Sequence, residues 1–204
     1  MVRAWQQVRQ TVREGFRAFT LALDLIARTN DHATSRNSGE RAPTSEQRIK
    51  AFEAWMGDIY AEKKDRLFDW MSAAQSYAED WNDLTPVRVR SGHSQPLIAL
   101  SPIQVIGWDD WKPLAMELRR QSRETRGLGQ AWLAAAYGML NRRAMGLYLA
   151  GIDESNLPMI FARAILSLRD AAERAVDGPE LINAFARVLA TSNQQRAKLE
   201  ARLI

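Results

Sequence analysis

The chain has 204 residues, with no cysteine and only two histidines. The absence of cysteine excludes disulfides, thiolate metal ligands and cysteine nucleophiles, and it is typical of a reducing compartment such as the cytoplasm. Two histidines without any cysteine are too few for an ordinary zinc or iron site. We therefore expect no disulfide framework, no metal and no cofactor, and a cytoplasmic location.

Long hydrophobic runs are also lacking. No stretch approaches the roughly 18 uncharged apolar residues that a membrane-spanning helix needs, and the opening MVRAWQQ interrupts any signal-peptide pattern with a charge and amides. Proline and glycine are scarce, at 7 and 11 residues, whereas 46% of the residues are apolar. We expect a globular protein of one or two domains, without a transmembrane segment or secretory signal.

The usual sequence signatures of catalysis are missing as well. The chain has no Glu-x-x-His pair of the kind that holds di-iron centres in helical bundles, and no Gly-x-Ser-x-Gly nucleophile turn. Its one Gly-x-Gly, at Gly127 and Gly129, follows a predicted helix instead of a strand, which is the wrong context for a phosphate loop. We therefore expect a protein that is not an enzyme and has no small-molecule substrate, although a site assembled from distant residues stays open.

Helical periodicity is the strongest pattern present. Apolar residues recur every three or four positions from Trp5 to Ile26, which predicts one amphipathic helix over residues 2–28. Residues 29–44 contain no large apolar side chain and many turn-forming types, which predicts an exposed, mobile loop.

A second apolar stripe follows this loop. It recurs in heptad-like fashion from Ile49 to Leu84 with one clear break at Lys63, and it predicts a helix of about 40 residues of the coiled-coil type. Thr44 and Gln47 have the spacing of a capping box, in which each side chain satisfies a backbone N–H at the helix start.

Charge favours pairing between these two helices. The net charge is only +4, but residues 1–45 carry three more bases than acids, and residues 46–84 carry four more acids than bases. Opposite charge on neighbouring faces stabilises their contact. We expect a long antiparallel helical hairpin over residues 1–84.

The remainder of the chain changes in character at Thr85. Residues 85–110 combine prolines and glycines with strand-forming residues, which predicts an extended connector with a possible short β-ribbon. Helical patterns then return over 111–204, in four segments that end near Arg126, Leu149, Val176 and Ile204. The predicted fold is all-α: a long hairpin, this connector and a compact bundle of about four helices.

The length of the second stripe carries the functional hypothesis. A two-helix hairpin cannot bury so long a stripe completely, so we expect a non-enzymatic interaction or assembly protein that self-associates or docks on a protein partner. The candidate interface residues are Phe52, Met56, Ile59, Leu67 and Trp70. The same tryptophan-rich stripe leaves open a role in coating a lipid or polymer surface.

An arginine cluster supports an alternative from another class. Guanidinium groups about one helical turn apart can each engage a phosphate, so the chain can also be a small helical subunit that binds the DNA or RNA backbone non-specifically within a nucleoprotein complex. The candidate residues are Arg88, Arg90, Arg119, Arg120, Arg123, Arg126, Arg142 and Arg143. Ion pairing of these arginines with acids of the same chain is the structural alternative.

Overall fold

The computed structural model describes residues 2–34, 43–62, 64–85, 95–125, 128–174 and 178–190. Within these ranges the chain forms α-helices α1 to α10 and two short 3-10 turns, η1 and η2, with no strand. The all-α class predicted from the sequence is confirmed. None of the helices in these ranges combines the length and apolar character needed to cross a membrane.

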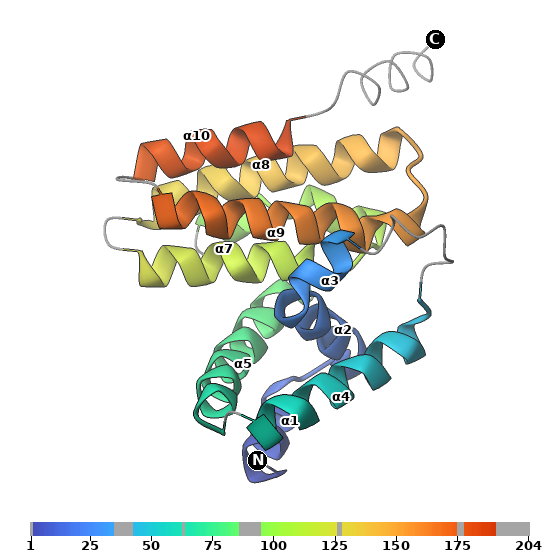
Figure 1. Cartoon of the computed structure of the whole chain (residues 1–204). Coiled ribbons are helices and arrows are strands. Elements are labelled where there is room, and N and C mark those ends of the chain that lie inside the picture. Colours follow the sequence, from blue (N-terminus) through green and yellow to red (C-terminus); the bar gives the residue numbers. More distant parts are fainter. Residues whose placement is uncertain are drawn as a thin grey trace.

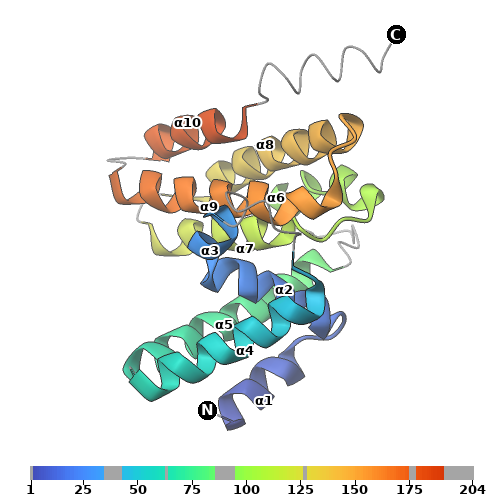
Figure 2. The same cartoon turned by 45° about the vertical axis from the view of Figure 1, so that its right-hand side comes forward.

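Five helices form the N-terminal part of the molecule. They are α1 (Val2–Thr11), α2 (Phe16–Ala27), α3 (Thr29–Thr34), α4 (Ser45–Glu62) and α5 (Lys64–Leu84). Figure 2 shows α4 and α5 side by side, with α1 next to them at the end of the molecule that carries the N-terminus; in Figure 1 the same two helices meet at the lower left. Helix α1 packs mainly on α5, and α2 packs on α4.

The prediction of one helix over residues 2–28 is wrong, because the chain breaks between α1 and α2. Gly15 adopts a left-handed conformation with φ of 71°, which favours glycine and ends the helical path. Two side chains of α5 form hydrogen bonds to the backbone at this break. Trp81 Nε1 donates to the carbonyl of Glu14 at 2.9 Å, and Asn82 Nδ2 donates to the carbonyl of Thr11 at 2.7 Å. The bond to Thr11 satisfies a carbonyl that the end of α1 leaves without a helical partner, and the bond to Glu14 satisfies one in the segment that follows.

The single helix of about 40 residues is also wrong, since α4 and α5 are separate helices that pack on each other. Helix α4 ends at Glu62 and α5 begins at Lys64, on either side of the predicted break at Lys63, which lies outside the described residues. The capping box at the start of α4 is confirmed: Thr44 N donates to Gln47 Oε1 at 2.8 Å, and Gln47 N donates to Thr44 Oγ1 at 3.3 Å.

The first part of the predicted loop is a helix with a buried side. Thr29, His32 and Ala33 of α3 are buried, and α3 packs against α9. The expectation of an exposed loop is wrong here because small polar side chains form hydrogen bonds in the protein interior. For example, Thr29 Oγ1 donates to the carbonyl of Leu25 at 2.8 Å. Residues 35–42 of the predicted loop lie outside the described residues.

The remaining elements follow from residue 95 onward. They are α6 (Gln95–Ile98), η1 (Pro102–Ile106), α7 (Lys112–Glu124), α8 (Gln130–Leu149), η2 (Glu154–Asn156), α9 (Leu157–Arg174) and α10 (Gly178–Leu189). Helices α7 to α10 pack on one another in the upper half of Figure 1, with α10 at the outer edge.

The predicted extended connector is wrong from residue 95 onward. That stretch consists mainly of helical turns, because Leu97, Leu100 and Ile103 must turn inward together to be buried. Residues 86–94, where the β-ribbon was expected, lie outside the described residues.

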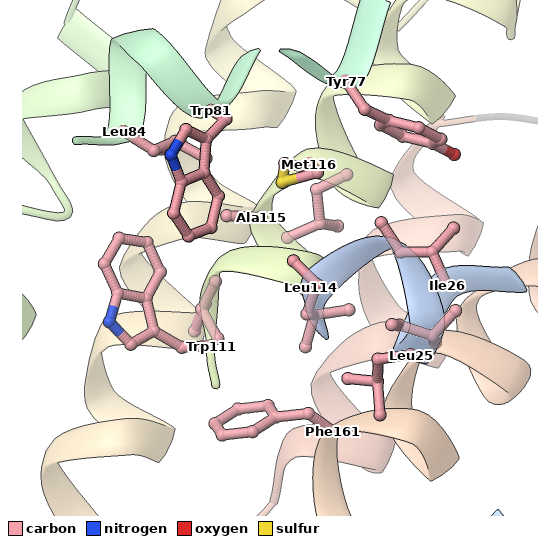
Figure 3. Close-up of a cluster of buried hydrophobic side chains, with 14 of the residues drawn as sticks. Leu25, Ile26, Tyr77, Trp81, Leu84, Trp111, Leu114, Ala115, Met116 and Phe161 are labelled. Carbon is pink, nitrogen blue, oxygen red and sulfur yellow. The ribbon is translucent and has the colours of Figure 1, made fainter. Parts of the chain in front are cut away.

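One hydrophobic core joins the N-terminal helices to the later ones. Figure 3 shows Trp81 of α5 beside Leu114 and Met116 of α7, with Leu25 of α2 and Phe161 of α9 below them. All five side chains are at most 1% exposed. Burial of this apolar surface packs α2 and α5 against the bundle and so stabilises the attachment of the N-terminal helices to it.

Candidate interaction groove and buried ion clusters

A surface groove of about 220 Å³ lies between α1, α2 and α4, and most of its lining is apolar. Its lining residues are Trp5, Phe16, Arg17, Thr20, Ile49, Phe52, Glu53 and Met56. We call this feature the N-terminal groove. Aromatic contacts hold its shape, since the Trp5 ring lies 5.7 Å from that of Phe16 and 6.3 Å from that of Phe52.

The chemistry of the N-terminal groove favours an apolar occupant. The one buried polar residue in its lining, Thr20, donates its hydroxyl hydrogen to the carbonyl of Phe16 at 2.9 Å and so needs no ligand. Two charges flank the apolar surface: Arg17 is exposed on α2 and Glu53 is exposed on α4. Neither forms an ion pair within the described residues.

The predicted interface residues divide between the interior and this groove. Leu67 is buried inside the chain, and Phe52 and Met56 are buried while also lining the N-terminal groove. Ile59 and Trp70 are half-buried and pack against the core. Contacts within the chain therefore bury much of the apolar stripe that runs from Ile49 to Leu84.

Sequence patterning did not identify most of the groove. Trp5 and Phe16 belong to the apolar stripe expected for residues 2–28, but a single straight helix offers no concave surface. The groove exists because the break at Gly15 directs α1 away from α2. A glycine inside a helical pattern was the only signal for this break.

Other large apolar side chains are exposed elsewhere on the described part of the chain. Phe68 on α5 is 64% exposed, and Val105 in η1 is 88% exposed. Trp108 packs edge-on against Tyr148, with 5.4 Å between ring centroids. Exposed apolar residues are normal on a protein surface, so exposure alone does not make these positions a site.

The arginine cluster is extensively paired with carboxylates of the same chain. Arg119 Nε lies 3.1 Å from Asp80 Oδ1, and Arg123 donates two 2.8 Å hydrogen bonds to the two oxygens of Asp80. Arg120 pairs with Glu117 and Glu124. Asp80 is only 2% exposed, so these arginines neutralise a buried charge.

The other candidate arginines are not gathered into a phosphate-binding row. Arg142 is exposed on α8, and Arg143 donates to the carbonyl of Ala190 at 3.4 Å. Arg88, Arg90 and Arg126 lie outside the described residues. A pocket of about 150 Å³ includes Arg119 and Arg123, but both side chains already hold Asp80. Nucleic-acid binding stays a prediction without added support.

A buried ion cluster surrounds Asp24 of α2, which is fully buried. Its carboxylate accepts hydrogen bonds from Arg28 Nε at 2.7 Å and Arg48 Nε at 3.0 Å, and its Oδ2 lies 2.7 Å from His32 Nε2. Burial raises the pKa of Asp24, but the His32 hydrogen bond and the charges of His32 and Arg48 outweigh burial and lower that pKa overall. We call Asp24, Arg28, His32 and Arg48 the Asp24 cluster. Its contact between Arg48 and Asp24 connects α4 to α2.

A second buried cluster surrounds Glu117 of α7. Tyr77 Oη donates to Glu117 Oε2 at 2.8 Å, Arg169 Nε donates to Oε1 at 2.9 Å, and Arg120 Nη2 donates to Oε1 at 2.6 Å. Burial raises the pKa of Glu117, but the hydrogen bonds from Arg169 and Arg120 prevail and bring it to about 2. We call these four residues the Glu117 cluster.

Neither cluster has the arrangement of a catalytic centre. The central carboxylate of each cluster accepts hydrogen bonds from side chains of its own chain, so neither carboxylate is held free for a ligand. His32 serves the Asp24 cluster, and His93 lies outside the described residues. The described ranges hold no group of three or more metal-ligating side chains.

Comparison with known proteins gave no match to a protein-family model, a curated protein or a solved structure. The functional conclusion therefore depends on the geometry of the N-terminal groove.

Proposed function

We propose that this protein is a non-enzymatic assembly protein that self-associates by seating an apolar protein segment in the N-terminal groove. The observation that carries the proposal is the groove itself: a hollow of about 220 Å³ with a mostly apolar lining, between the packed helices α1, α2 and α4. Burial of apolar surface is the main driving force of protein association. Arg17 and Glu53, which form no ion pair with another described residue, would orient the bound segment through their charges.

The oligomeric state of the purified protein tests this function. Light scattering after size-exclusion chromatography, over a range of protein concentrations, is expected to give a mass above that of the monomer that falls on dilution. Ile49→Asp places a charge in the groove lining and is expected to produce a monomer. A wild-type chain that is monomeric throughout the range contradicts the proposal.

Ile98→Asp is the matched control. Ile98 lies on α6, outside the groove, and is 48% exposed, so the same substitution there introduces the same charge on another surface. This variant is expected to associate like the wild type. Equal loss of association in both variants would show that the added charge acts non-specifically. Circular dichroism checks that both variants keep their helices.

A further inference from the structure

A second surface pocket, with a volume of about 270 Å³, lies between α2, the first turn of α4 and the residues at the start of α7. We call it the Asp110 pocket. Part of its wall is one apolar face of α2, formed by residues three or four positions apart: Ala18, Leu21, Ala22 and Leu25. The Asp110 pocket shares no lining residue with the N-terminal groove, so it is a separate feature.

Asp110 contributes a half-buried carboxylate to this pocket. Within the described part of the chain it forms no ion pair, whereas its neighbour Asp109 lies 2.7 Å from Lys112 Nζ. Burial is the largest effect on the pKa of Asp110 and raises it; Arg48 lowers this pKa, Asp109 and Glu154 raise it, and the result is above the ordinary value. A cationic group bound beside Asp110 would offset the cost of burying this carboxylate.

Arg48 of α4 contributes a base to the same pocket. Its Nε donates to Asp24 and its Nη2 donates to the carbonyl of Leu21, but its Nη1 donates no hydrogen bond to another described residue. This Nη1 is also not sealed from solvent. Because Asp24 also pairs with Arg28, its charge does not serve Arg48 alone. Arg48 can therefore donate a further hydrogen bond, strengthened by charge, to an anionic group of a ligand.

The acid and the base line the same pocket without pairing with each other. Arg48 and Asp110 form no ion pair, so both charges stay available to one ligand. A ligand that carried only a positive charge would meet Arg48, and one that carried only a negative charge would meet Asp110 and Asp109. The charges therefore favour a molecule that carries both signs.

Size and wall chemistry narrow the ligand further. Pockets for drug-sized ligands measure about 300–1,000 Å³, so the Asp110 pocket suits a smaller molecule. The apolar face of α2 offers a surface against which an apolar side chain can be buried. A small zwitterion with an apolar side chain satisfies all three features of the pocket.

We infer that the Asp110 pocket binds a free amino acid with an apolar side chain. The ammonium group lies beside Asp110, the carboxylate lies beside Arg48, and the side chain packs on the apolar face of α2. This site does not depend on the proposed function, because association through the N-terminal groove uses other residues.

Calorimetric titration of the full chain with L-valine, L-leucine and L-phenylalanine at millimolar concentrations tests the inference. Saturable binding of at least one of them is expected. Glycine is expected to bind more than tenfold more weakly than the best of the three, because it buries no apolar side chain. Failure of all three to bind overturns the inference, and equal binding of glycine overturns the role of the α2 face.

Two derivatives of the best-binding amino acid test its two charged groups. The N-acetyl derivative lacks the ammonium charge, and the carboxamide derivative lacks the carboxylate charge. Each is expected to bind about tenfold more weakly than the parent, because a hydrogen bond to a charged group is lost. A derivative that binds as tightly as the parent contradicts the contact assigned to the group that it lacks.

Asp110→Asn tests the residue that receives the ammonium group. The change removes the charge and breaks no ion pair with a described residue, and circular dichroism checks that the variant is folded. It is expected to weaken binding of the amino acid about tenfold and to leave binding of the N-acetyl derivative unchanged. A merely structural effect would weaken both ligands. Equal affinity of the wild type and Asp110→Asn for the amino acid overturns the inference.

Asp58→Asn is the matched control. Asp58 is exposed on α4, lies outside the Asp110 pocket and forms no ion pair within the described ranges. The same change from acid to amide is expected to leave the affinity for the amino acid unaltered there. Equal weakening in both variants would show that the net charge of the chain, not Asp110, governs binding, and would overturn the assigned contact.

Arg48 is kept intact in these experiments, because its loss would also disturb the Asp24 cluster. The carboxamide derivative tests its contact instead.

Discussion

Glu117 and Arg169 form a hydrogen bond of 2.9 Å between Oε1 and Nε, although 52 positions separate them in the sequence. Arg169 continues beyond this contact, because its Nη2 donates to the carbonyl of Ile26 at 3.2 Å. The pair therefore connects α7, α9 and the carboxyl end of α2. It stabilises the attachment of the groove-bearing helices to the bundle.

Removal of the Glu117 charge is expected to destabilise the whole chain. Glu117→Gln leaves Arg120 and Arg169 without their carboxylate in a buried setting, and breaking a buried ion pair costs about 3–5 kcal/mol. Urea unfolding followed by circular dichroism measures the loss. Glu124→Gln is the control, since Glu124 also pairs with Arg120 but its side chain is 57% exposed; its expected cost is under about 1 kcal/mol. Equal costs would contradict a special role for Glu117.

The lowered pKa of Glu117 predicts how the stability of the folded chain depends on pH. This pKa falls from an ordinary 4.5 to about 2 in the folded chain, so the unfolded chain binds the proton more readily between these values. The contribution of this carboxylate to the free energy of unfolding is complete above about pH 5, and it is lost as the pH falls from about 4.5 towards 2. Asp24, whose pKa is also lowered, acts in the same direction.

Urea unfolding at a series of pH values measures this dependence. The wild type is expected to lose stability steeply below about pH 4.5, and Glu117→Gln is expected to show a shallower slope because it cannot take up that proton. Parallel slopes for the two proteins would show that Glu117 does not contribute to acid unfolding.

The Asp24 cluster predicts how α4, one wall of the groove, is held. Arg48 is buried, and besides its bond to Asp24 it donates Nη2 to the carbonyl of Leu21 at 2.9 Å. Arg48→Gln is expected to cost about 3 kcal/mol because Asp24 loses a charged partner. Backbone amides of α4 are expected to exchange hydrogen faster, since the attachment of this helix to α2 is weakened.

Lys50→Gln provides the control for this prediction. Lys50 lies half a turn further along α4, and its side chain is 73% exposed in a pair with Glu46. The change is expected to alter stability by less than about 0.5 kcal/mol and to leave hydrogen exchange in α4 unchanged. Faster exchange in both variants would mean that helix propensity, not the Asp24 cluster, controls the motion of α4.

Sequence periodicity predicted helices well where one helix is packed by its neighbours along its whole length. One predicted helical segment was expected to end near Leu149, and α8 (Gln130–Leu149) ends at that residue; the capping box at Thr44 and Gln47 forms as expected. In both cases the governing contacts are local, or they repeat with the period of the helix itself.

The same periodicity failed at the break before α2 because the apolar stripe stays in phase across it. Val12 and Phe16 are four positions apart, the spacing of a continuous helix, while the chain leaves the helical path at Gly15. The buried clusters were equally hidden, since Asp24 and Arg48 are 24 positions apart and meet only after folding. Local spacing carries no information about such distant partners.

Gly15 and Gly57 both lie in helical sequence patterns, but their replacement by alanine is expected to change the stability of the chain in opposite directions. Gly15 has φ of 71°, and a residue with a side chain pays about 1–2 kcal/mol to adopt this conformation. The nearest atom to an added Cβ, Trp81 Cζ2, lies at an ordinary 3.6 Å, so backbone strain and not a clash sets the cost of Gly15→Ala.

Gly57 lies inside α4 with no atom within 4 Å of an added Cβ. Gly57→Ala is therefore expected to stabilise the chain by about 0.5–1 kcal/mol, because alanine loses less conformational freedom than glycine on entering a helix. Thermal and urea unfolding of the two variants measure both changes. A stabilising Gly15→Ala would contradict the left-handed break between α1 and α2, and with it the path of α1 that opens the N-terminal groove.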